Sequence, residues 1–248
     1  MTPEEFEEEV RRNVEQQGED VALRRDSVDW MIRSAKYKYS YNFRWLGRPI
    51  IQFPQDIVAM QELVWSLQPD LVIETGIAHG GSLIFYASLL ELNALCGGPA
   101  NAIVFGVDID IRSHNRSAIE AHPLAKRVVM VEGSSTDPDV VRRAAELAGA
   151  RQRVLVCLDS NHTHDHVLAE LHAYSPLASV GSYCVVFDTF IEALPPRMYP
   201  DRPWDRGNNP GTAVRAFLAA HPEFQPDKEF DAKLLISVAP GGFLKRLA

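Results

Sequence analysis

Short apolar runs alternate with amphipathic segments along most of the chain, and five of these runs end in an acidic residue. A short apolar run bounded by polar residues predicts a buried strand, and a 3.6-residue periodicity between runs predicts a helix. This alternation is typical of repeated βα units, which build a parallel sheet. Parallel strands are expected at 71–74, 103–108, 128–132, 154–159 and 182–188.

Two further apolar runs, 233–238 and 243–247, are joined by Ala-Pro-Gly-Gly and predict a closing hairpin. The sheet would then have seven strands. Helices are expected between the runs, at 54–67, 81–95, 137–148, 163–174 and 210–220. The pattern therefore predicts an α/β fold, a seven-stranded mostly parallel sheet with helices on both faces.

The first 50 residues precede the predicted sheet and predict an N-terminal helical cap, separate from a domain at 51–248. The cap carries an aromatic cluster, Tyr37, Tyr39, Tyr41, Phe43 and Trp45. These rings either close over a site as a lid or only pack the cap onto the sheet. The connection 194–209 is long and rich in Pro, Arg and Asn, and long loops of this kind are often functional.

Composition narrows the class of protein. A 46% hydrophobic and 23% charged chain of 248 residues is ordinary for a globular protein, which excludes a mainly disordered chain. Because 33 acidic residues outnumber 25 basic ones, we expect no nucleic-acid partner. Three scattered cysteines predict no disulfide framework. No signal pattern or membrane-spanning apolar run is found, so we expect a cytoplasmic protein without membrane contact.

The strongest motif is Glu74-Thr-Gly-Ile-Ala-His-Gly-Gly-Ser82, which follows the first predicted strand and opens a helix. Glycines there let a ligand approach the backbone, and the helix start offers free N–H groups. Dinucleotide enzymes use the spacing GxGxxG, whereas ExGxxxG favours S-adenosylmethionine. We predict that Glu74, Gly76, Gly80 and Ser82 bind this cofactor; the alternative is a tight turn without a ligand.

Asp108 closes the next strand, where a carboxylate can accept hydrogen bonds from both ribose hydroxyls of the cofactor. Asp110, two residues further on, is the alternative acceptor. Ser134 and Ser135 lie just beyond the third strand and could meet an adenine edge. Equally, Ser135 or Thr136 could cap the following helix.

Asp159 and Asp188 end the fourth and fifth predicted strands. Adjacent parallel strands would bring these carboxylates close together, and two anions repel unless a cation lies between them or one is protonated. We predict that both bind Mg²⁺, which prefers oxygen ligands. The alternative is that one of them only caps a helix or turn.

Three histidines follow Asp159, at 162, 164 and 166. The run H-T-H-D-H is one residue short of the HxHxDH pattern of zinc hydrolases of the metallo-β-lactamase type. We predict that His162, the first histidine after the aspartate, acts as a general base, because neutral imidazole can take a hydroxyl proton near pH 7. His164 is expected at a surface helix start.

Taken together, five stretches resemble the cephalosporin hydroxylase family, which includes S-adenosylmethionine-dependent methyltransferases such as rhamnosyl O-methyltransferases of natural-product pathways. They are WLGRPIIQFPQD (45–56), ETGIAHGGS (74–82), LDSNHTHDHVLAEL (158–171), YCVVFDT (183–189) and NNPGTAVRAFL (208–218). The resemblance runs from Trp45 to Arg246.

The resemblance implies a class I methyltransferase fold, Rossmann-like, with the final strand antiparallel. It also implies a magnesium site at the positions of Asp159 and Asp188. The family often has an acidic pair at the second position, but here Phe187 precedes Asp188, which removes one ligand. Gln52 and Gln55 match a family segment near the cofactor pocket.

We therefore expect a magnesium-assisted O-methyltransferase that acts on a deoxysugar hydroxyl, such as a rhamnosyl group, of a glycosylated natural product. Asp159 and His162 would be its catalytic residues, and the resemblance favours a homo-oligomer. Two alternatives stay open at this point. One is a nicotinamide-dependent oxidoreductase on a similar fold, and the other is a non-catalytic accessory subunit that holds the cofactor.

Overall fold

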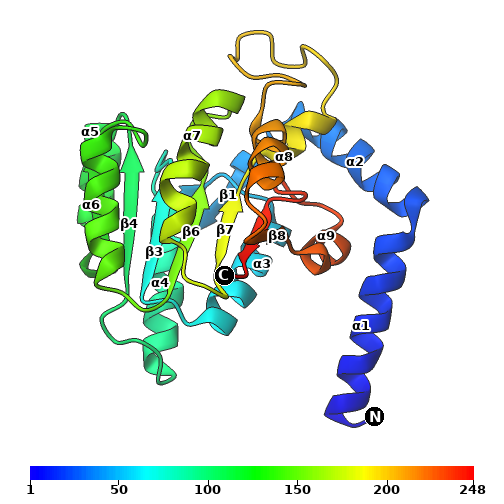
Figure 1. The fold of residues 1–248 in the computed structure, drawn as a ribbon, viewed down its shortest axis with the longest axis horizontal. Coiled ribbons are helices and arrows are strands. Elements are labelled where there is room, and N and C mark those ends of the chain that lie inside the picture. Colours follow the sequence, from blue (N-terminus) through cyan, green and yellow to red (C-terminus); the bar gives the residue numbers. More distant parts are fainter.

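The computed structural model describes all residues from 1 to 248 and contains one seven-stranded sheet (Figure 1). The strand order is β5-β4-β3-β6-β7-β9-β8. The strands are β3 Leu71–Thr75, β4 Ile103–Asp108, β5 Val128–Glu132, β6 Val154–Leu158, β7 Tyr183–Val186, β8 Phe224–Pro226 and β9 Phe243–Arg246. Only β9 runs antiparallel to its neighbours. The predicted mostly parallel sheet with an antiparallel final strand is confirmed.

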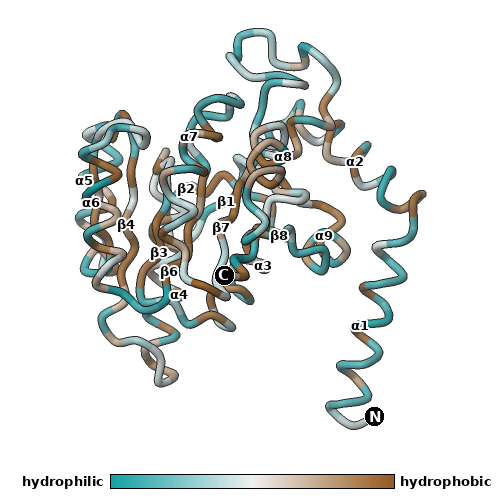
Figure 2. The backbone as a smooth tube through the Cα atoms, in the orientation of Figure 1, coloured by the Kyte–Doolittle hydropathy of each residue, from teal (hydrophilic) through white to brown (hydrophobic).

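Helices cover both faces of this sheet. One buried apolar cluster joins the sheet to α3 and α4, and a second joins it to α6, α7 and α8. Figure 2 shows the apolar strands between these helices. The helices are α3 Pro54–Leu67, α4 Gly81–Leu95, α5 Ser113–Glu120, α6 Pro138–Gly149, α7 His164–Tyr174, α8 Pro210–Ala220 and α9 Lys228–Leu234. Four short 3₁₀ helices are η1 Tyr39–Asn42, η2 Ala125–Arg127, η3 Ser175–Leu177 and η4 Thr189–Ala193.

The predicted hairpin of 233–238 with 243–247 is wrong in its first half. Lys233 and Leu234 end α9, and β9 instead lies between the earlier strands β7 and β8, antiparallel to both. Short apolar runs fit a helix or a strand equally well by periodicity. Here the segment after α9 is fixed by Asp56 of α3, whose carboxylate accepts hydrogen bonds from Ser237 Oγ at 2.6 Å and Val238 N at 3.0 Å.

The N-terminal region consists of α1 Pro3–Glu19, α2 Val21–Ala35 and a small hairpin of β1 Phe43–Trp45 and β2 Arg48–Ile50. The hairpin packs on α4, where Trp45 Nε1 donates to Ser88 Oγ at 3.0 Å. In contrast, no residue of α1 is buried, and its N-terminal part projects from the molecule (Figure 1). Its C-terminal end contacts α9, where Gln17 Nε2 donates to the carbonyl oxygens of Ala232 and Lys233 at 2.9 Å. The expected division into a cap at 1–50 and a domain at 51–248 stays a prediction. No helix has the length and apolar character needed to cross a bilayer.

The two hydrogen bonds that Asp56 accepts from Ser237 and Val238, here called the Asp56 clamp, predict a measurable change in the free energy of unfolding. Asp56 is fully buried, so Asp56→Ala leaves the Val238 N–H and the Ser237 hydroxyl without this acceptor. We expect urea unfolding to show a loss of about 2–4 kcal/mol, since each unsatisfied buried group costs about 1–3 kcal/mol. The matched control is Asp137→Ala, which removes the exposed cap of α6 and should cost about 1 kcal/mol. Equal losses would contradict the clamp.

Candidate active site

A cavity of about 790 Å³ opens at the carboxyl ends of the parallel strands. Residues at the end of β4, or one or two positions after the ends of β3, β5, β6 and β7, line it: Asp108, Gly76, Ser134, Asp159 and Asp188. The chain order of the sheet reverses at β3, which pairs with both β4 and β6. Ligands of open α/β sheets bind at such a reversal. The N-terminal segment and the 194–209 loop complete the cavity wall.

The glycine loop after β3 is set by a close backbone approach. Gly76 has φ +93°, and a Cβ atom there would lie 2.0 Å from the carbonyl oxygen of Asp159. Gly80 has φ +78° and precedes the first residue of α4. Both positions therefore require glycine, and the loop after β3 is held directly against the end of β6.

Asp108 lines the cavity and also orients this loop. Its Oδ2 accepts hydrogen bonds from the backbone N–H groups of Ile77 at 2.8 Å and Ala78 at 3.1 Å. Asp110, the alternative ribose acceptor, instead lies exposed beside Arg112 at 3.6 Å and is not part of the cavity wall. The geometry therefore favours Asp108 for a ligand in the cavity.

Glu74 lies beneath the loop rather than in the cavity wall. It is 1% exposed and accepts a hydrogen bond from Ser82 Oγ at 2.9 Å, and Ser82 itself lines the cavity. Burial raises the pKa of Glu74 to about 8. The side chain is therefore mostly protonated at neutral pH and links β3 to the first turn of α4.

Ser134 and Ser135 both lie in the cavity wall after β5. The alternative in which Ser135 or Thr136 caps α6 is wrong, since Asp137 is the cap and accepts a hydrogen bond from Asp139 N at 2.8 Å. Ser135 Oγ instead lies 3.0 Å from His166 Nε2. Ser135 therefore lies in the cavity wall with its hydroxyl held by His166 rather than used to cap α6.

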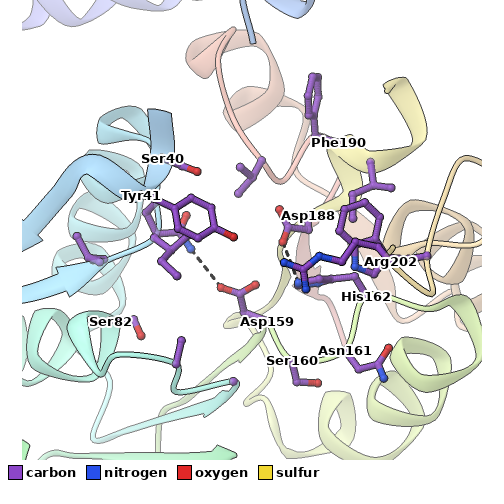
Figure 3. Close-up of a pocket in the computed structure, with 18 of the residues that line it drawn as sticks. Ser40, Tyr41, Ser82, Asp159, Ser160, Asn161, His162, Asp188, Phe190 and Arg202 are labelled. Carbon is purple, nitrogen blue, oxygen red and sulfur yellow. Dashed lines mark hydrogen bonds and ion pairs between the residues drawn. The ribbon is translucent and has the colours of Figure 1, made fainter. Parts of the chain in front are cut away.

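Asp159, Asp188 and His162 form the centre of the cavity (Figure 3). One donor atom from each lies within 4.8 Å of the other two, and His162 Nε2 is 3.2 Å from Asp188 Oδ2. Gln52 Nε2 donates a weak hydrogen bond to Asp159 Oδ2 at 3.4 Å. Burial, and then the negative charge of Asp188, raise the pKa of Asp159 well above its usual range.

The two carboxylates of this cluster fit a divalent cation. They repel each other and supply oxygen ligands, and the His162 imidazole, paired with Asp188, lies beside them. The Oε1 atom of Gln52 is buried without a hydrogen-bond partner. The wall beside Asp159 therefore offers one more oxygen acceptor that no protein group uses. Phe187 is buried in the apolar core, so no second acid beside Asp188 supplies a ligand.

The other two histidines point to different partners. His164 Nδ1 lies 2.8 Å from Thr212 Oγ1 of α8, whereas His166 contacts Ser135. A two-zinc hydrolase site needs these rings to converge on shared ions, and they do not. The zinc interpretation of the histidine run therefore fails on geometry.

Several site residues were not predicted from the sequence. Trp204 of the 194–209 loop lies 6.0 Å from the His162 ring and 5.5 Å from the Tyr199 ring, measured between centroids. Ser160 and Glu170 surround His166. The length and composition of the loop signalled a function for it, but did not single out Trp204. His166 and Glu170 are four residues apart on α7, a helical spacing that could have signalled their contact.

Known proteins are similar to this chain over most of its length. The family model Rhamnosyl O-methyltransferase/CmcI matches residues 37–247, which confirms the resemblance inferred from the sequence. Rhamnosyl O-methyltransferase of Mycobacterium tuberculosis (strain ATCC 25618 / H37Rv) is 32% identical over 196 residues, covering 77% of this chain and 73% of that protein. The Mycobacterium leprae (strain TN) protein of the same name is 30% identical over 208 residues, 82% of each chain.

Solved structures support the fold. A CmcI structure described as Mg-SAM is similar with a TM-score of 0.58 and 18% identity, covering 84% of this chain and 78% of that one. At this identity the similarity bears on the fold alone. It agrees with the predicted class I methyltransferase architecture.

The glycine contact gives a direct test. Gly76 and Gly97 have nearly equal φ angles, +93° and +92°, but a Cβ atom at Gly97 would meet nothing within 4 Å. We expect both alanine variants to lose about 1–2 kcal/mol from backbone strain. Gly76→Ala should lose a further amount of about 1–3 kcal/mol from the overlap with Asp159. Urea unfolding measures both, and equal losses would show that the approach to Asp159 does not constrain the loop.

The buried Glu74 predicts a pH dependence. Because its pKa rises from 4.5 to about 8 on folding, the folded state keeps a proton that the unfolded chain releases. The stability that Glu74 contributes therefore falls as pH rises through this window, by at most about 1.4 kcal/mol per pH unit. Glu74→Gln should flatten the decline in the free energy of unfolding between pH 5 and pH 8.

The control for this titration is Glu132→Gln at the exposed end of β5, which should leave the slope unchanged. An identical slope for wild type and Glu74→Gln would contradict a protonated Glu74.

Proposed function

Because the chain belongs to the Rhamnosyl O-methyltransferase/CmcI family, we propose that it transfers a methyl group from S-adenosylmethionine to a hydroxyl of a sugar. The acceptor would be a deoxysugar, such as a rhamnosyl group, of a glycosylated natural product. The observation that carries this proposal is the cluster of Asp159, Asp188 and His162 beside the glycine loop, in one cavity. Family membership favours this activity over an oxidoreductase.

The cofactor would occupy the side of the cavity formed by the loops after β3, β4 and β5. Gly76 lines this side of the cavity and leaves room for the Asp159 carbonyl, Gly80 leaves room for Ile119, and Glu74 holds the loop from below through Ser82. Asp108 Oδ2 accepts from the Ile77 and Ala78 N–H groups and Oδ1 accepts from Asp110 N at 3.1 Å, so Oδ1 keeps one lone pair for a ribose hydroxyl. Ser134 and Ser135 would then face the adenine end.

Asp159 and Asp188 would hold the divalent cation, with Mg²⁺ as our choice. When bound there, the cation would lower the effective pKa of an acceptor hydroxyl and offset the repulsion between the two carboxylates. Gln52 would steady Asp159 through its amide. Asp188 stands at the start of η4 with φ +57°, so the backbone turn directs its side chain toward Asp159.

His162 would accept the proton of the acceptor hydroxyl. As the hydroxyl oxygen bonds to the methyl carbon, the carbon–sulfur bond breaks, and S-adenosylhomocysteine leaves. The contact with Asp188 orients the imidazole and stabilises its protonated form. Trp204 and Tyr199 would exclude water and stack on the apolar face of the sugar ring.

The remaining features of the protein are also proposals. The N-terminal 50 residues would act as a cap on a cofactor-binding domain at 51–248, since Tyr39 and Tyr41 of this segment reach the cavity wall. We propose a homo-oligomer that acts on small glycosylated molecules in the cytoplasm, with no nucleic-acid partner.

Substitutions in the cluster separate metal binding from proton transfer. Asp159→Asn and Asp188→Asn each remove a charged ligand, so we expect cation affinity, measured by calorimetry, to fall at least about 10-fold. His162→Gln should keep cation affinity within about threefold but lower kcat by about 10²–10⁴. The control is Asp110→Asn, an exposed acid outside the cavity, which should change neither quantity.

The activity itself is tested by incubating the protein with S-adenosylmethionine, Mg²⁺ and a panel of rhamnosyl glycosides. We expect S-adenosylhomocysteine and a product heavier by one methylene group, detected by mass spectrometry. Binding of the cofactor without methyl transfer to any glycoside would favour the accessory-subunit alternative. Stabilisation by NADH but not by S-adenosylhomocysteine would contradict the proposal.

A further inference from the structure

A second polar network lies in the same cavity, outside the Asp159–Asp188 cluster. His166 Nε2 lies 3.0 Å from Ser135 Oγ and 3.3 Å from Ser160 Oγ. Ser160 Oγ donates a hydrogen bond to Glu170 Oε1 at 2.7 Å, and the same oxygen is 3.5 Å from His166 Nε2. Ser135, Ser160 and His166 all line the cavity. None of these contacts is needed for the proposed proton transfer.

Glu170 lies buried at the inner end of this network. Its side chain is 0% exposed, and its Oε2 atom has no hydrogen-bond partner. Burying a carboxyl oxygen without a hydrogen-bond partner costs free energy, so such a group in a folded protein calls for an explanation. The neighbours of its Oε1 atom are Ser160 and His166, which both face the cavity.

The network lies at the adenine end of the proposed cofactor site. Ser135 follows β5, which pairs with β4, and β4 ends in the proposed ribose acceptor Asp108. A nucleoside with its ribose on Asp108 and its methyl group near Asp159 therefore places its base beside Ser135. The backbone of Ser135 is held in place by Tyr174, whose hydroxyl donates to the Ser135 carbonyl oxygen at 2.7 Å.

The hydrogen-bond polarity of the network follows from the contact between Ser160 and Glu170. Ser160 Oγ donates to Glu170 Oε1 at 2.7 Å, so the one hydroxyl proton of Ser160 is used on Glu170. The lone pairs of Ser160 and the carboxylate then favour a proton on Nε2 of His166. Since that N–H also points to Ser135 Oγ, the Ser135 hydroxyl is an acceptor from His166, and its own proton is left for the cavity.

We propose that Glu170 and His166 are positioning residues that turn the Ser135 hydroxyl into a hydrogen-bond donor toward the base, and so select adenine over hypoxanthine. The inference rests on the proposed function. Adenine presents an unprotonated N1 that accepts from Ser135. Hypoxanthine carries a hydrogen on N1, which would place two donors against each other. An unpaired or opposed buried donor is strongly disfavoured.

The test compares two ligands, S-adenosylhomocysteine and S-inosylhomocysteine, by calorimetry with the full-length protein. We expect wild type to bind the adenine compound about 10–100-fold more tightly than the hypoxanthine compound. Ser135→Ala should reduce this ratio to within about threefold, because the selecting hydroxyl is gone. Glu170→Gln should do the same, because its amide can donate to Ser160 and reverse the network.

Two further variants separate positioning from a general loss of structure. His166→Gln can place an amide N–H where Nε2 stood and should restore most of the ratio, whereas His166→Ala should not. The control Glu146→Gln lies on the exposed face of α6 and should keep the wild-type ratio. Cation affinity at Asp159 and Asp188 should stay within about threefold in every variant, which checks that the cavity is folded.

The outcomes distinguish this inference from the proposed function. If wild type binds S-adenosylhomocysteine but does not discriminate, or if Glu170→Gln and His166→Ala keep the wild-type ratio, the inference is wrong while the function stands. If wild type binds neither compound, the cofactor assignment falls and this inference falls with it.

Discussion

The electrostatic repulsion between Asp159 and Asp188 is the interaction on which the site depends. Pairing of β6 with β7, with Leu158 opposite Val186, brings the two following aspartates to the same edge of the sheet. Glu74, Glu170 and Asp56 add to the forces that raise the pKa of Asp159. A divalent cation between them would offset this repulsion, because both carboxylates would then act as its oxygen ligands.

The scaffold keeps this arrangement rigid through close backbone contacts. The loop after β3 rests on the Asp159 carbonyl at Gly76, and the carboxylate of Asp108 ties the same loop to β4. On the other side, Gly81 leaves room for the backbone of Pro49 and so lets the N-terminal hairpin approach α4. The proposed cofactor half and the proposed metal half of the cavity are thus parts of one preorganised unit.

Much of this fold was readable from the sequence because its signals are local. Apolar runs that end in an acid predicted the strands and placed Asp108, Asp159 and Asp188 at one edge. The prediction failed at 233–238, where a short apolar run was equally compatible with a helix end, and the tie to Asp56 is separated from it by about 180 residues in the chain. The short polar helix α5 was not predicted because it carries too few apolar positions to show a period.

Side-chain networks were the least predictable part of the site. The contact between Ser135 and His166 joins a loop to a helix 31 residues away, and no local pattern encodes it. Gln52 was singled out only through the family resemblance, and its contact with Asp159 depends on the fold of the N-terminal segment. His162 was selected by adjacency to Asp159, yet its ring contacts Asp188, which follows the next strand.

The most direct test of the central claim is a crystal structure with S-adenosylhomocysteine and Mn²⁺, in which anomalous scattering locates the ion. The account predicts one ion bound by both Asp159 and Asp188 at about 2 Å from each carboxylate, beside the sulfur of the ligand and next to His162. An ion bound elsewhere, or two aspartates that stay apart with no shared ion when the ligand is present, would contradict it.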